Sequence, residues 1–98
     1  MLKALFGPKV TVKVRILGLV GDRMVHFDGQ ICLRGTPDVH QVLRAAGRAA
    51  GVDLLAALDA GAEPSIMLSG ERLDLPADLT RPVPDGAQIA WLMPMAGG

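Results

Sequence analysis

The residues best suited to chemistry in this sequence are the last ones. Gly97 and Gly98 follow Pro94, Met95 and Ala96 at the end of the chain. Because glycine has no Cβ atom, such a segment can enter a narrow channel in a partner enzyme. A carboxylate is a poor electrophile, so acyl transfer first requires its activation, as adenylation by ATP provides. We therefore expect the Gly98 carboxylate to be the reactive group, with Gly97 leaving the activating enzyme room to close around it.

The other polar side chains lack the partners that catalysis or metal binding requires. His26 and His40 have no carboxylate or thiol at metal-ligand spacing, so solvated histidines are expected. Cys32 is the only cysteine and has no adjacent base, which favours a passive thiol over a reactive one. Four aspartates are predicted beside turns, bonded to their own backbone: Asp22, Asp28, Asp74 and Asp85. We expect no metal site and no independent enzymatic activity.

The composition is that of a single globular domain. The chain has 98 residues, of which half are hydrophobic and a fifth are charged. Ten Lys plus Arg balance ten Asp plus Glu, so no strong positive field is expected to attract nucleic acid or an anionic membrane. Residues 1–8 lack the apolar core of a secretory signal and are interpreted as a short N-terminal extension. These features predict a cytoplasmic protein without nucleic-acid or membrane partners.

Two strands are predicted in the first third of the chain. Alternating apolar residues predict the first strand: Val10, Val12, Val14 and Ile16. A turn is predicted over Gly18–Arg23, because this segment contains two glycines and an aspartate. Residues of one parity predict the second strand: Val25, Phe27, Ile31 and Leu33. Within it, Asp28-Gly29 can form a tight hairpin turn, a bulge or a kink.

A main helix is predicted from about Pro37 to Ala50. Thr36 can cap its free N–H groups, Pro37 suits the first helical position, and Asp38 complements the helix dipole. Its buried face has the three-and-four spacing of an amphipathic helix: Val39, Val42, Leu43 and Ala46. Gly51 suits the left-handed residue that ends many helices. A shorter helix is predicted over Asp53–Asp59, with three leucines packing inward: Leu54, Leu55 and Leu58.

The remaining elements complete a sheet. A short strand is predicted over 66–68, a turn at 69–70 and a brief partner strand over 72–75, stopped by Pro76. The apolar run 88–93 predicts a central strand buried on both faces, with Ile89 and Trp91 in the core. Leu92 and Met95 are the better candidates for an interface. Together these elements predict an α+β fold with a mixed sheet of four to five strands packed on one main helix.

The closing segment Pro84–Gly98 resembles that of the sulfur-carrier family that contains the molybdopterin synthase small subunit and the thiazole-biosynthesis sulfur carrier. The shared features are an Asp-Gly turn, a hydrophobic strand, a proline and a terminal Gly-Gly. Segments 69–73 and 36–43 also resemble the family. The chain departs from it in extra residues before Val10 and around Gly18–Gln30, and in Met93, where many members have a proline.

This resemblance implies a ubiquitin-like β-grasp domain over residues 9–94 and a flexible tail over 95–98. It implies that a ubiquitin-activating-type adenylyltransferase adenylates Gly98, using ATP, and that the carboxylate becomes a thiocarboxylate. The sulfur would then pass to a synthase subunit in molybdopterin-type or thiamine-type cofactor biosynthesis. No cofactor would be bound by the chain itself, and its partner-binding residues would be Leu92, Pro94, Met95 and Ala96.

Two other functions fit the same sequence features. A ubiquitin-like modifier would be joined to lysines of other proteins through Gly98. A non-covalent β-grasp interaction subunit would use its folded surface and leave Gly97-Gly98 inert. Deletion of the two glycines separates this last function from the other two, because only the interaction subunit would keep full function without them.

Overall fold

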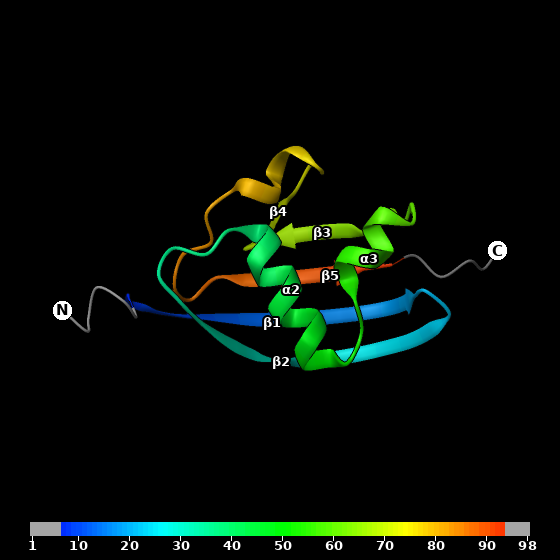
Figure 1. Cartoon of the computed structure of the whole chain (residues 1–98), viewed down its shortest axis with the longest axis horizontal. Coiled ribbons are helices and arrows are strands. Elements are labelled where there is room, and N and C mark those ends of the chain that lie inside the picture. Colours follow the sequence, from blue (N-terminus) through cyan, green and yellow to red (C-terminus); the bar gives the residue numbers. More distant parts are fainter. Residues whose placement is uncertain (1–6, 94–98) are drawn as a thin grey trace.

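Five strands form one mixed sheet, and the helices lie on one of its faces (Figure 1). The computed structural model describes residues 7–93. The strands are β1 (Lys9–Val20), β2 (Arg23–Arg34), β3 (Ser65–Leu68), β4 (Glu71–Arg72) and β5 (Gln88–Leu92). The helices are α2 (Val39–Ala50), α3 (Leu54–Asp59) and the short 3-10 helix η1 (Ala77–Thr80). The predicted α+β architecture, with a mixed sheet and one main helix, is confirmed.

The central strand of the sheet is β5. The strand order is β2-β1-β5-β3-β4, in which β5 runs parallel to β1 and all other neighbouring pairs are antiparallel. No helix in the described part of the chain is long and apolar enough to cross a bilayer.

The β1–β2 hairpin is longer than predicted. The chain turns within the predicted segment Gly18–Arg23, but the turn is only Gly21 and Asp22, because β1 continues to Val20 and β2 begins at Arg23. Gly18 lies within the ladder opposite Val25. The glycine at position 18 was interpreted as a turn residue, whereas in a strand interior it can also mark a close approach of another backbone.

Asp28 and Gly29 do not interrupt β2. The hairpin register is continuous, with Asp28 opposite Arg15 and Gly29 opposite Val14, so neither a hairpin turn nor a bulge is present there. Instead, Gly29 makes room for an aromatic ring. A Cβ atom at this position would lie 2.9 Å from Cζ of Phe27, which is too close for an ordinary contact. Glycine therefore allows the Phe27 ring to pack over the inner face of β2.

The hydrophobic core lies between the sheet and the helices. Its largest fully buried side chains are Trp91, Ile16, Leu43, Leu54, Ile66, Val12, Val39 and Val42. The predicted inner faces of the first strand and of the main helix are thus confirmed. Burying one such side chain stabilises the fold by roughly 2 kcal/mol relative to leaving it exposed.

The prediction that the last strand is buried on both faces is wrong for β5. Ile89 and Trp91 are buried in the core as predicted, being 3% and 1% exposed. Ala90 and Leu92 point to the opposite face and are only half-buried. The reason is that helices cover a single face of the sheet (Figure 1). We call the uncovered face the open face.

Helix α2 begins two residues later than predicted. Its N-cap is Asp38, whose Oδ1 accepts a hydrogen bond of 2.8 Å from the Gln41 N–H. The Asp38 N–H donates to Oε1 of Gln41 at 3.0 Å, which completes a capping box. Pro37 precedes the helix, because its carbonyl accepts the Val83 N–H at 2.9 Å and so holds it in a tertiary contact. The predicted helix end is confirmed, with Gly51 left-handed at φ 77°.

The cap assignment predicts which of two neighbouring substitutions destabilises the protein. Asp38→Ala is expected to lower the free energy of unfolding by about 1 kcal/mol, because the N–H of Gln41 loses its acceptor. Thr36→Ala, at an exposed position outside the capping box, is the matched control and should leave the stability nearly unchanged. Urea unfolding of both variants measures the difference, and equal losses would contradict the assignment.

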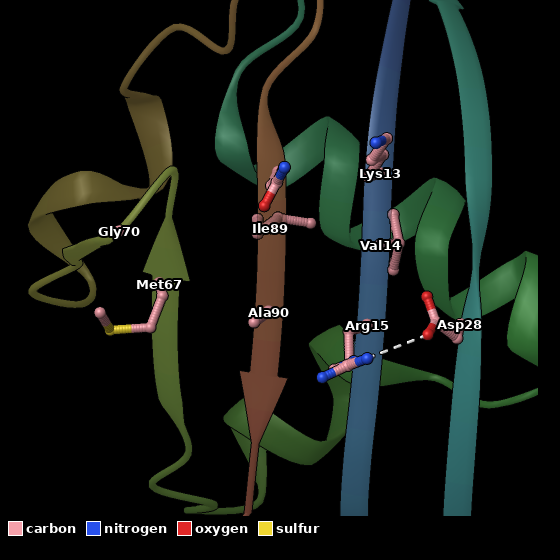
Figure 2. Close-up of a pocket in the computed structure, with 9 residues that line it drawn as sticks. Lys13, Val14, Arg15, Asp28, Met67, Gly70, Ile89 and Ala90 are labelled. Carbon is pink, nitrogen blue, oxygen red and sulfur yellow. Dashed lines mark hydrogen bonds and ion pairs between the residues drawn. The ribbon is translucent and has the colours of Figure 1, made fainter.

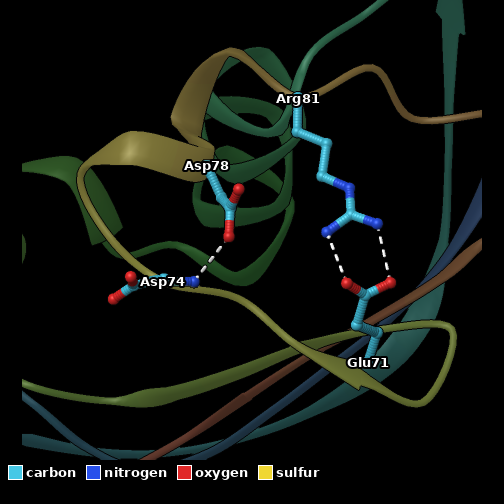
Figure 3. A network of polar contacts seen from close by, with 4 residues as sticks. All are labelled: Glu71, Asp74, Asp78 and Arg81. Carbon is cyan, nitrogen blue, oxygen red and sulfur yellow. Dashed lines mark hydrogen bonds and ion pairs between the residues drawn. The ribbon is translucent and has the colours of Figure 1, made fainter.

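The second helix is confirmed as α3, with Asp53 as its N-cap and Leu54 in the core. The predicted strand over 72–75 is shorter, since β4 ends at Arg72. The chain turns away because the Asp74 N–H donates to Oδ2 of Asp78 at 2.7 Å (Figure 3). The Asp78 N–H in turn donates to the Asp74 carbonyl at 2.8 Å. These two bonds lead the chain into η1.

A bidentate ion pair joins β4 to the segment after η1. The guanidinium of Arg81 donates to both carboxylate oxygens of Glu71, at 2.9 and 2.6 Å (Figure 3). These hydrogen bonds, and secondarily the positive charge, hold the pKa of Glu71 below its ordinary value of 4.5. A carboxyl with a depressed pKa stabilises the folded state above its unfolded pKa, and this contribution is lost as the pH falls through the folded pKa.

Replacing Arg81 by Gln should therefore return the pKa of Glu71 toward its ordinary value. A nuclear magnetic resonance (NMR) titration of the side-chain carboxyl carbons measures the pKa in both proteins. The stability difference between wild type and Arg81→Gln should also shrink as the pH is lowered below about 4.5. An unchanged Glu71 pKa in the variant would show that the ion pair does not persist in solution.

Candidate functional site

The candidate site lies on the open face, at the end of β5. Leu92 of β5 lies in register with Leu17 of β1, and Leu19 lies opposite Met24 of β2. Leu17, Leu19 and Met24 expose 44%, 39% and 55% of their surface. Together with the half-buried Leu92 they form an apolar surface that we call the exit patch. Exposed apolar groups gathered in one place commonly mark a protein interaction site.

The path of the chain beyond β5 is set by β1. The Met93 N–H donates to the Leu17 carbonyl at 2.9 Å, which extends the pairing of the two strands by one bond. Gly18 has a positive φ of 120°, and a Cβ atom there would lie 2.5 Å from the Met93 carbonyl oxygen. Met93 therefore passes directly over Gly18, where no other residue would leave enough space. This contact fixes the direction of the chain next to the exit patch.

The predicted site residues are described only in part. Leu92, predicted as an interface residue, is half-buried and belongs to the exit patch. The other predicted positions lie outside the described residues: Pro94, Met95, Ala96, Gly97 and Gly98. Gly18, Leu17, Leu19 and Met24 were not identified as site residues from the sequence. Gly18 could have been recognised from the sequence, because it is a glycine at an inner-face position of a strand whose other inner-face residues are apolar.

A hollow of about 370 Å³ lies next to the exit patch, over the middle of the sheet. It forms because β5 presents only the small side chain of Ala90 there, while longer side chains stand around it (Figure 2). Lys13 and Arg15 come from β1, and Met67 comes from β3. Arg15 also donates to Oδ2 of Asp28 at 3.1 Å, in an exposed ion pair.

The open face carries an excess of positive charge. The cations on the outward positions of β1 and β2 are Lys9, Lys13, Arg15 and Arg34, and the one carboxylate among the outward residues of these two strands is Asp28. Because the whole chain has a formal net charge of zero, its acidic residues lie mainly elsewhere. The balanced composition concealed this local excess, although Lys9, Lys13 and Arg15 share one parity of the first strand.

The remaining polar candidates are dispersed. Within residues 7–93, no three His, Cys, Asp or Glu side chains lie close enough together to hold a metal ion. Cys32 is exposed, with its Sγ 3.8 Å from Oγ1 of Thr11. Asp28 differs from the predicted turn position, because it lies within β2. Asp85 lies in a turn as predicted, but its Oδ1 accepts the N–H of Thr11, far away in the sequence, at 2.8 Å.

No model of a known protein family matches the chain, and no curated protein matches it either. The site itself therefore carries the functional argument. Its parts are an apolar patch, a cationic hollow and a central strand whose end leads into the last five residues. Such a surface is suited to docking a partner protein beside the emerging chain.

Proposed function

We propose that this chain is a sulfur-carrier protein. A ubiquitin-activating-type enzyme would adenylate the Gly98 carboxylate, which would then become a thiocarboxylate and donate sulfur in molybdopterin-type or thiamine-type biosynthesis. The proposal includes a ubiquitin-like β-grasp fold. A mixed sheet with one main helix and a parallel central pair, β1 and β5, supports that fold assignment. A single unpaired cysteine agrees with action in a reducing cytoplasm.

The observation that carries the proposal is the position of the β5 end beside the exit patch. Five residues separate Met93 from the Gly98 carboxylate, so the carboxylate can lie at most about 17 Å beyond the folded domain. A partner that covers Leu17, Leu92 and their neighbours can therefore hold the reactive group in its own active site. Binding energy from the patch would offset the entropic cost of ordering a glycine-rich tail.

In the proposed reaction the chain provides a substrate group and no catalytic side chain. A Gly98 carboxylate oxygen attacks the α-phosphorus of ATP, and pyrophosphate leaves. Sulfide released from a sulfur donor then attacks the acyl carbon and displaces AMP, which leaves the thiocarboxylate. Glycine at both final positions leaves space for these attacks, because no Cβ atom stands beside the acyl carbon. ATP is bound and consumed by the activating partner.

Reconstitution tests the proposal. The chain is incubated with the ubiquitin-activating-type enzyme of the same organism, ATP and a sulfur donor, and its intact mass is recorded. The expected result is a mass gain equal to the exchange of one oxygen for sulfur, with labelling by a thiol-specific reagent. An unchanged mass would contradict the proposal. Adducts on lysines that carry a tryptic remnant of this C-terminus would instead indicate a protein modifier.

A further inference from the structure

The hollow on the open face has the features of a receptor for a carboxylate. Its floor is the small Ala90, and two cationic side chains, Lys13 and Arg15, rise from adjacent outward positions of β1 (Figure 2). Arg15 shares its charge with Asp28, whereas Lys13 makes no ion pair with any residue of the described chain. One positive charge at the hollow is therefore left for an external anion.

The hollow and the exit patch belong to one continuous surface. Arg15 and Leu17 are successive outward residues of β1, about 7 Å apart along the strand. On β5, Ala90 of the hollow and Leu92 of the patch are related in the same way. A protein domain that covers the patch therefore also covers the hollow, and must present to it a group of suitable charge.

We propose that the partner docking at the exit patch inserts an acidic side chain, Glu or Asp, into the hollow between Lys13 and Arg15. The partner is the activating enzyme if the proposed function holds, so the identity of the partner, but not the chemistry of the contact, rests on that function. The contact selects partners, because a basic or apolar group at this place would leave Lys13 desolvated without a counter-charge.

A protein carboxylate fits this surface better than a polyphosphate. The hollow is bordered by Met67 and floored by Ala90, which favour the aliphatic stem of an acidic side chain. Asp28 stands at its rim and would repel a second negative charge. A nucleic acid needs a track of many cations, whereas here the cations adjoin an apolar patch.

An NMR titration tests the contact without an enzyme. The probe is the synthetic peptide acetyl-Glu-Glu-Leu-Glu-Glu-amide, and its control has Gln in place of each Glu. We expect the acidic peptide to shift the amide signals of Lys13, Arg15, Gln88 and Ala90, and the Gln peptide to bind about fivefold more weakly. Shifts located elsewhere, or no shifts, would overturn the proposal. So would equal binding of inorganic phosphate or of a short DNA duplex.

Charge reversal supplies a matched pair of variants. Lys13→Glu should weaken binding of the acidic peptide about fivefold, whereas Arg44→Glu, on the exposed side of α2, makes the same charge change and should have no effect. Both variants are first checked for a native amide spectrum. If wild type becomes a thiocarboxylate and Lys13→Glu does so at the same rate, the contact is refuted while the proposed function stands. Peptide binding at the hollow without any thiocarboxylate would refute the function alone.

Discussion

Removing Gly97 and Gly98 is expected to reduce the rate at which the chain is adenylated by about a hundredfold, without changing the temperature at which it unfolds. The truncation shortens the reach of the terminal carboxylate by about 7 Å, and misplacement by even 1 Å can cost about a hundredfold in rate. The buried core lies within residues 10–91, so the folded domain keeps its packing. Pyrophosphate exchange with the activating enzyme and a thermal melt give the two readouts.

A matched variant distinguishes the effect of moving the carboxylate from the effect of reducing the space around it. Gly98→Ala keeps the chain length and the carboxylate but adds a Cβ atom next to the acyl carbon. Its adenylation should fall between those of wild type and of the truncated chain. If the chain without Gly97 and Gly98 is adenylated as fast as wild type, the terminal carboxylate is not the reactive group.

The second large effect is expected from Gly18→Ala, which should lower the free energy of unfolding by about 3 kcal/mol. An added Cβ would meet the Met93 carbonyl oxygen at 2.5 Å, and the positive φ of 120° is strained for any other residue. The steric contact and the backbone strain would both disturb the chain at Met93, directly after β5. The variant should therefore also be adenylated less efficiently, mainly through a raised KM.

Gly21→Ala is the control for Gly18→Ala. It also has a positive φ, of 64°, but no heavy atom lies within 4 Å of its added Cβ. Its cost should be limited to the backbone strain of about 1 kcal/mol. Urea unfolding followed by the fluorescence of Trp91, the only tryptophan, measures both variants. Equal losses would show that contact with Met93 does not fix the path of the chain.

The first strand and the main helix were predictable because each has a periodic pattern of apolar residues. Val10 to Ile16 alternate, and all four apolar residues of this segment are buried. The helix start was misplaced because three successive residues all favour the beginning of a helix: Thr36, Pro37 and Asp38. The choice among them depends on the Val83 N–H bond to Pro37, which is distant in sequence.

The candidate site was predicted less completely than the fold. The predicted turn at Gly18–Arg23 left Leu19 outside the first strand, and Met24 was not assigned to the second, so the exit patch was not recognised. The role of Gly18 depends on Met93, which lies 75 residues further along the chain. The cationic hollow was missed because net charge sums over the whole chain and carries no information on which side chains share a face.

The most direct test of the central claim is the intact mass of the protein isolated from its own cells under conditions that preserve thioacids. We predict a species that ends at Gly98 and carries one sulfur in place of a terminal oxygen, together with the unmodified form. A chain that continues beyond Gly98, or one that ends there but never carries the sulfur, would contradict it.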